Sequence, residues 1–246
     1  PLNRSNEYIE NNVQAFTNVL QLVTELEVPN FLYASSSSVY GNSEEIPYSE
    51  SSRDIHPVSI YGATKRANEL LAPAYVRQSK TRARGLRFFT VYGPWGRPDM
   101  APIKFAKSII AGQKIQIYNN GNHSRDFTYI DDIVSGIRLV ADRVAVSDTL
   151  FNRALPSQGS SYVPWRVFNI GGENPIALMD FVSKLERALN RKANVEFVTR
   201  QIGDMDKTSA DCSAIRKATG WSPKVSLDQG LANLADWCES NLDLLG

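Results

Sequence analysis

Short apolar segments alternate along this chain with longer segments whose apolar residues recur every three or four positions. The longer segments, at 6–28 and 59–80, have the spacing of amphipathic helices. The short ones, at 31–34 and 84–91, lack the strict alternation of half-exposed strands, which is typical of strands buried on both faces. This order predicts an α/β fold with a parallel sheet. Pro73 lies inside the second helical segment and predicts a kink or an end there.

From Pro94 onward the chain carries further elements of both kinds, separated by turn-rich segments. Two polar stretches, 42–58 and 145–164, read as loops. The apolar spacing predicts helices at 103–111, 131–144, 176–190, 211–219 and 227–241, and strands at 115–118, 167–170 and 195–198.

The composition is that of an ordinary globular protein, and it excludes several classes of function. Hydrophobic residues make up 42% and charged residues 22% of the 246, and the net charge of +1 provides no basic field for nucleic acid. No apolar run is long enough to suggest a membrane span. Cys212 and Cys238 are too few for a disulfide framework and suggest reduced thiols in the cytoplasm. His56 and His123, the only histidines, do not form a metal-ligand pattern.

The sharpest local signal is Tyr61-x-x-x-Lys65, because residues four apart share one face of a helix. A lysine ammonium beside a phenol stabilises the phenolate, which lets a tyrosine take or give a proton near neutral pH. Such a pair also arises by chance on an exposed helix face. Ser36, 25 residues earlier, follows a buried strand, and ligand sites in parallel sheets lie outside the carboxyl ends of the strands. The alternative for Ser35–Ser38 is a polar loop.

In order and spacing, these residues resemble the extended short-chain dehydrogenase/reductase family, and within it the UDP-glucuronate 4-epimerase branch of the nucleotide-sugar epimerases. The resemblance spans nearly the whole chain. It rests on the motifs Ala34–Gly41 (ASSSSVYG), Tyr61–Lys65 (YGATK), Leu86–Met100 (LRFFTVYGPWGRPDM), Gly121–Asp132, Phe168–Gly171 (FNIG), and Gly203-Asp204 followed by Asp211.

By that resemblance, Ser36, Tyr61 and Lys65 are the catalytic triad of an NAD-dependent enzyme. Tyr61, Lys65 and Ser35 would contact NAD, and Asn12 matches an asparagine that braces the same site. The implied chemistry is transient oxidation. Hydride leaves C4 of a UDP-sugar for NAD, the 4-keto sugar turns over, and hydride returns to the opposite face.

Two departures narrow the implied reaction. The dehydratases of this family carry an Asp-Glu pair just before the Val-Tyr-Gly, and UDP-xylose synthases carry a Glu there, whereas this chain has Ser37 and Ser38. No carboxylate is available for elimination or decarboxylation, so plain epimerisation is favoured, with both serines near the sugar. The carboxylate of UDP-glucuronate needs a cationic donor, for which Arg97 is the first candidate. The other residues that the resemblance places at the substrate are Thr90, Tyr118, Arg125 and Asp204, although Gln201 replaces an arginine common in relatives.

The glycine-rich loop that the family uses for the NAD pyrophosphate has no counterpart here. The resemblance therefore implies an N-terminally truncated Rossmann-like parallel sheet in residues 1–93, which binds NAD poorly and is inactive alone. A smaller α/β substrate domain would occupy 94–246, with segments near 115–135 and 165–175 returning to the Rossmann core. Family members usually pair through the two helices at 6–28 and 59–80, so a homodimer is implied. The alternatives are an inactive nucleotide-sugar-binding remnant and a related UDP-sugar decarboxylase or dehydratase.

Overall fold

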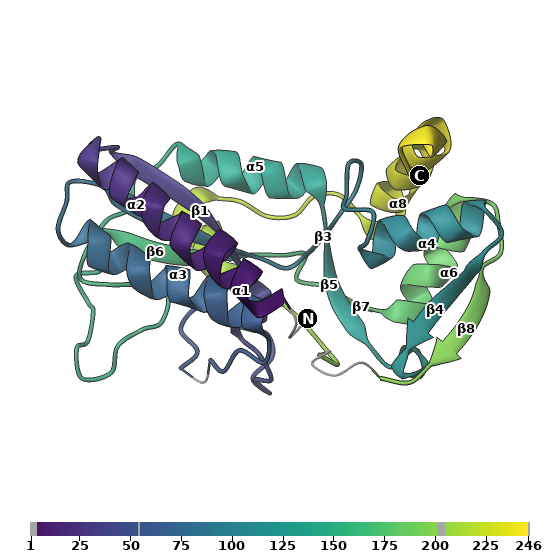
Figure 1. Cartoon of the computed structure of the whole chain (residues 1–246), viewed down its shortest axis with the longest axis horizontal. Coiled ribbons are helices and arrows are strands. Elements are labelled where there is room, and N and C mark those ends of the chain that lie inside the picture. The colour runs from purple at the N-terminus through teal and green to yellow at the C-terminus, as the bar shows by residue number, and fades with distance from the viewer. Residues whose placement is uncertain (1–3, 54, 201–204, 246) are drawn as a thin grey trace. The chain divides into compact units, whose positions relative to one another are not determined.

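The computed structural model describes residues 4–53, 55–200 and 205–245, and the chain folds into two compact units (Figure 1). Neither unit is one continuous segment. Unit 1 combines Pro1–Phe89, Ser135–Ile170 and Ala210–Trp221. Unit 2 combines Thr90–Val134, Gly171–Ser209 and Ser222–Gly246.

Unit 1 is built on a parallel sheet of three strands in the order β1-β2-β6. Ala34 of β1 pairs with Leu86 of β2, which pairs in turn with Phe168 of β6. The predicted parallel α/β arrangement is therefore confirmed. The strands are β1 (Asn30–Ser36), β2 (Arg82–Phe88) and β6 (Trp165–Ile170).

Helices α2 and α3 lie side by side over one face of this sheet (Figure 1). Their apolar residues share one core with the strands, which explains the helical spacing in the sequence. The core contains Leu20, Tyr33, Ala72, Val76, Ala83, Val163, Trp165 and Val167. The helical elements of unit 1 are α1 (Ser5–Tyr8), the π-helical turn η2 (Ile9–Gln14), α2 (Ala15–Glu25), η3 (Ser37–Val39), α3 (Ile60–Val76) and α7 (Ser213–Thr219).

The structure refines two expectations for unit 1. Helix α3 does not end at Pro73 but continues to Val76, and Ala72 and Val76 on either side of the proline are packed in the core. The predicted strand at 84–91 is split at Phe89, where the chain leaves one sheet for another. Its first part is β2, and its last residues join β3 (Thr90–Tyr92) in unit 2.

Unit 2 contains two small sheets and three helices packed around a second apolar core. β3 and β5 are parallel, β7 is antiparallel to β5, and β4 pairs in parallel with β8. The core takes Phe127, Phe181, Leu185 and Leu234 from three different elements. The elements are α4 (Ala101–Ile110), β4 (Lys114–Tyr118), η4 (Asn119–Gly121), β5 (Ser124–Tyr129), β7 (Pro175–Ala177), α6 (Leu178–Ala188), β8 (Asn194–Val198), α8 (Leu227–Ser240) and η5 (Leu242–Leu245). Helix α5 (Ile130–Ala141) begins in unit 2 and continues into unit 1.

The apolar pattern of the sequence does not predict β5, because this strand buries polar residues. Asp126 is 0% exposed, and its carboxylate accepts the backbone N–H groups of Gly172 (2.6 Å) and Glu173 (3.1 Å). A buried carboxylate bonded in this way ties β5 to the segment that leads into β7. Within the described part of the chain, no helix has the length and apolar content to cross a membrane.

Candidate active site

The serine cluster lies where β1 ends, in unit 1. Ser36 is the last residue of β1 and caps η3, since its Oγ accepts the Ser38 backbone N–H at 3.1 Å. Ser36 is buried, whereas Ser37 and Ser38 are half-buried. The cap turns the chain sharply at the carboxyl end of a parallel strand, which is the usual place for a ligand site.

Tyr61 and Lys65 lie on the first two turns of α3, which begins where Ser59 Oγ accepts the Gly62 backbone N–H at 3.0 Å. The Lys65 ammonium donates to the Ala34 carbonyl at 3.1 Å and lies 5.8 Å from the centre of the Tyr61 ring. Burial lowers the pKa of Lys65. The Tyr61 side chain is 36% exposed. Lys65 therefore links the tyrosine to the end of β1.

The first turn of α3 also approaches the serine cluster closely. A Cβ added at Gly62 would lie 2.5 Å from the Ser38 carbonyl oxygen, so the backbones of α3 and η3 are nearly in contact. The three predicted catalytic residues, Ser36, Tyr61 and Lys65, are thus brought together within one unit.

Asn12 supports this helix from the π-helical turn η2. Its Nδ2 donates to Thr64 Oγ1 at 2.9 Å, and the Thr64 hydroxyl donates to the Tyr61 carbonyl at 2.8 Å. π-helical turns often occur at functional sites. Asn12 therefore reaches the predicted site through Thr64 and the backbone of Tyr61.

Behind the serine cluster lies a buried ion pair that the pattern reading missed. Glu69 and Arg87 are each 0% exposed and are joined by two hydrogen bonds of 2.8 Å. Ser35 Oγ donates to Glu69 Oε1 at 2.6 Å. Because the side chain is engaged there, the backbone of Ser35 would make the predicted contact with NAD. Burial alone would raise the pKa of Glu69, but Arg87 and Ser35 hold it below its usual range. The sequence contains a signal for this ion pair. Arg87 is a charged residue inside an apolar run, and Glu69 follows Lys65 by one helical turn.

A second buried carboxylate adjoins this pair. Glu50 is 6% exposed, and its Oε1 accepts the Asn169 backbone N–H at 2.7 Å. Burial raises the pKa of Glu50, although the bond from Asn169 and the charge of Arg87 act in the opposite direction. Folded protein therefore keeps a proton on Glu50 at pH values where the unfolded chain has released it.

We expect this proton to make stability depend on pH. The free energy of unfolding should fall as pH rises from the ordinary carboxyl value of 4.5 through the raised folded value, and Glu50→Gln should lack this loss. Urea denaturation between about pH 4 and 8 would show the stability difference growing in favour of the glutamine variant. Glu45→Gln, at an exposed carboxylate of the same loop, is the control. A difference that does not change with pH would contradict the assignment.

The residues predicted at the substrate belong to unit 2, apart from Ser37 and Ser38. Thr90 opens β3, and Tyr118 ends β4, where its hydroxyl donates to Gln116 Oε1 at 3.4 Å; both are half-buried. Arg97 is 73% exposed and holds Asp99 through two hydrogen bonds.

Arg125 lies on β5, where its Nη1 donates to the carbonyls of Ser124 (3.2 Å) and Asp206 (3.3 Å). Asp204 and Gln201 lie outside the described residues.

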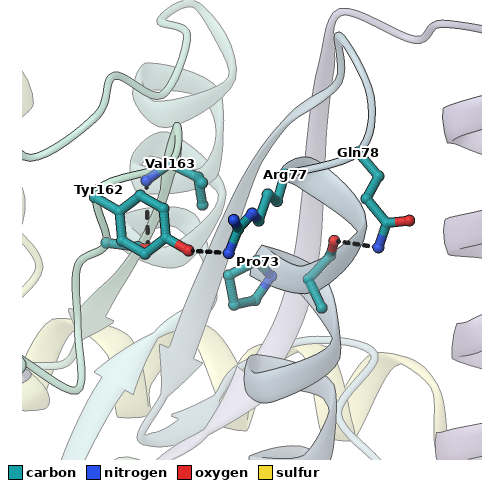
Figure 2. A pocket seen from close by; sticks show the side chains of 7 residues that line it. Pro73, Arg77, Gln78, Tyr162 and Val163 are labelled. Atoms are coloured by element: carbon teal, nitrogen blue, oxygen red, sulfur yellow. Dashed lines mark hydrogen bonds between the residues drawn. The ribbon is translucent and has the colours of Figure 1, made fainter.

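A separate cavity of about 590 Å³ opens near the carboxyl end of α3 (Figure 2). There Arg77 Nη1 donates to the Tyr162 hydroxyl at 2.7 Å. The residues that line this cavity include no predicted site residue. They are Pro73, Ala74, Arg77, Gln78, Ser161, Tyr162 and Val163. Tyr61 and Lys65 lie on the first two turns of the same helix, at its other end.

Comparison with known proteins agrees with this geometry. A family model described as the NAD dependent epimerase/dehydratase family matches residues 2–171. Protein CapI of Staphylococcus aureus is 42% identical over 230 residues, which cover 94% of this chain and 69% of that protein. "Probable UDP-glucuronate 4-epimerase" of Rhizobium meliloti (strain 1021) is 40% identical over 238 residues, covering 95% of this chain and 69% of that one.

A solved structure is similar over the same length. The UDP-glucuronic acid 4-epimerase of Bacillus cereus, in complex with UDP-glucuronic acid and NAD, matches 94% of this chain with a TM-score of 0.79 and 30% identity. The match covers 68% of that chain. The α/β architecture with parallel sheets is therefore one that solved epimerases share.

Proposed function

This chain belongs to the NAD-dependent epimerase/dehydratase family, and on that premise we propose that it interconverts UDP-glucuronate and UDP-galacturonate by inverting C4 of the sugar. NAD is its cofactor. One observation carries the proposal. Lys65 is bonded to the Ala34 carbonyl beside the Tyr61 ring, on the turn of α3 that faces the Ser36–Ser38 segment.

The residues of unit 1 fit the reacting end of NAD. Tyr61 is partly exposed beside the carboxyl end of β1, and the half-buried Lys65 ammonium has donors beyond the one it gives to Ala34. We propose that Tyr61, Lys65 and the backbone of Ser35 hold this end of the cofactor. When bound, NAD would accept the hydride from C4 of the sugar and later give it back to C4 from the opposite face.

The chain's own residues would then manage the proton and the orientation of the sugar. Tyr61 takes the proton of the 4-hydroxyl, while Ser36 donates a hydrogen bond to the same oxygen. The Lys65 ammonium stabilises the charge that develops on the tyrosine. After the 4-keto sugar rotates to present its opposite face, Tyr61 returns the proton to the oxygen at C4. The product then differs from the substrate only in its configuration at C4.

The substrate assignment rests on which side chains surround the reacting sugar. Ser37 and Ser38 stand where relatives that eliminate or decarboxylate have carboxylates, so epimerisation is favoured. From their match to the family motifs, we propose that Thr90, Arg97, Tyr118, Arg125 and Asp204 contact the UDP-sugar.

The direct test is to incubate the full-length gene product with UDP-glucuronate and NAD and to identify the products by NMR. UDP-galacturonate at an equilibrium ratio is the expected product. UDP-xylose or a stable keto sugar would instead assign a decarboxylase or dehydratase. UDP binding without turnover of any UDP-sugar would assign a binding remnant.

We expect Arg97→Ala to weaken UDP-glucuronate much more than UDP-glucose, because only the former has a carboxylate at C6. Arg97 is exposed, and its present partner is another carboxylate, that of Asp99. Losing a charge-assisted hydrogen bond costs about 1.5–3 kcal/mol. Isothermal calorimetry with both ligands measures the difference, and Arg153→Ala, at an exposed arginine of unit 1, is the control. Equal losses for both ligands would mean that Arg97 does not recognise the acid.

We also propose that two copies pair through the helices of unit 1. Exposed apolar residues lie on η2, α2 and α3 and at Leu26 directly after α2, where they would otherwise stay in water. They are Ile9 (50%), Val19 (44%), Leu22 (53%), Leu26 (67%) and Leu70 (60%). A monomeric mass by light scattering would refute the pairing.

Because Cys212 and Cys238 are buried free thiols, we propose a cytoplasmic location.

A further inference from the structure

One buried ion pair holds both ends of the segment that carries the serine cluster. At the start of the segment, Ser35 Oγ donates to Glu69 Oε1 at 2.6 Å. At its end, the Tyr40 hydroxyl accepts a hydrogen bond from Arg87 Nη1 at 2.8 Å. Glu69 and Arg87 are themselves joined by two bonds of 2.8 Å. The segment 35–40 is therefore a loop closed across the Glu69–Arg87 pair, and Glu69 Oε2 also accepts a hydrogen bond from Arg66 Nη1 at 2.9 Å.

The pair is anchored on three elements of unit 1. Glu69 belongs to α3, two turns beyond Tyr61 and one turn beyond Lys65. Arg87 belongs to β2, and the Tyr40 hydroxyl donates in turn to Asn169 Oδ1 of β6 at 2.7 Å. The catalytic helix and the serine segment are thus fixed to the same two side chains.

Stability alone is a poor explanation for such an arrangement. Glu69, Arg87 and Tyr40 are all 0% exposed, and apolar residues of similar volume often stabilise a core as well as a buried ion pair does. Hydrogen bonds differ from apolar contacts because they fix direction and distance. What these bonds fix is the position of Ser36–Val39 relative to α3.

We propose that Glu69 and Arg87 are positioning residues that set the placement of Ser36 against Tyr61 and Lys65. The inference rests on the proposed function, since it takes those three residues to be the catalytic groups. A displacement of about 1 Å at a reacting centre can cost on the order of 100-fold in rate, so loosening either end of the segment should lower kcat. Substrate contacts outside the segment would remain, so KM should change little.

The test uses variants that each remove one hydroxyl group, because deleting either buried charge also destabilises the fold. The Tyr40 hydroxyl is bonded to both Arg87 and Asn169, so its removal breaks two hydrogen bonds. Ser35→Ala frees the start of the segment and Tyr40→Phe frees its end. Tyr33→Phe is the matched control, since it also removes a buried hydroxyl of unit 1, one that accepts the Trp165 Nε1–H at 3.0 Å. We expect kcat to fall by about 10–100-fold in the first two variants, with KM within about threefold of wild type. A loss of kcat in Tyr33→Phe equal to that in Tyr40→Phe would overturn the proposal.

Amide hydrogen exchange tests the same proposal without substrate or cofactor. The Tyr40 N–H donates to the Ser37 carbonyl at 3.1 Å, and the Ser38 N–H donates to Ser36 Oγ. In Ser35→Ala and Tyr40→Phe we expect exchange in 36–40 to be at least about tenfold faster, with 30–33 of β1 unchanged as the internal reference. Unchanged exchange in 36–40 would overturn the proposal. If wild-type protein fails to epimerise UDP-glucuronate, the proposed function fails, and exchange still decides whether the pair holds the segment.

Discussion

Replacing Tyr61 by phenylalanine should abolish epimerisation while leaving UDP-sugar binding nearly intact. The phenolic hydroxyl is the only group of the side chain that the change removes, and the ring beside Lys65 is kept. Loss of a positioned proton-transfer group costs about 10²–10⁴-fold in rate. Turnover of UDP-glucuronate by the full-length gene product and UDP binding by calorimetry measure the two quantities separately.

The matched control is Tyr75→Phe, at a half-buried tyrosine of the same helix. It removes the same atom from the other end of α3, and we expect turnover within threefold of wild type there. Turnover by Tyr61→Phe within that same range would remove Tyr61 from the mechanism.

Arg87→Met should be among the most destabilising single substitutions in unit 1. It removes both bonds from Arg87 to the buried Glu69, which keeps its ion pair with Arg66, and it also deprives Tyr40 of a hydrogen-bond donor. Removing one member of a buried ion pair costs about 3–5 kcal/mol in the free energy of unfolding. For a protein of this size, that lowers the melting temperature by about 6–20 °C. Thermal unfolding followed by circular dichroism measures the shift.

Two further variants show whether burial of the ion pair causes the loss of stability in Arg87→Met. Lys80→Met breaks the exposed pair with Glu27, whose side chains are 78% and 59% exposed, and should cost less than about 1 kcal/mol. Arg87→Met combined with Glu69→Leu removes both fully buried charges, leaves Arg66 with its bond to Gln158, and should recover part of the loss. Equal melting temperatures for Arg87→Met and Lys80→Met would show that the buried pair contributes no more than a surface pair.

Local patterns in the sequence were sufficient for most of the helices and strands and for the predicted catalytic motif. The apolar runs at 31–34 and 167–170 lie within β1 and β6, the helical spacing of 227–241 matches α8, and the loop at 145–164 is confirmed. These patterns work because burial on two faces leaves a strand no polar positions, and burial on one face leaves a helix one apolar stripe. Tyr61 and Lys65 could be paired from sequence since one helical turn brings them together.

Only the tertiary structure decided how distant segments meet. It divided the predicted strand 84–91 at Phe89, because hydrogen-bond partners in two different sheets compete for a run that is apolar throughout. It also determined that Arg87 is buried. Its partners, Glu69 and Tyr40, lie 18 and 47 positions away, so no local spacing reveals that its charge is neutralised. A charge in an apolar run is ambiguous until its partners are known, because burying it is costly when unpaired and tolerable when paired.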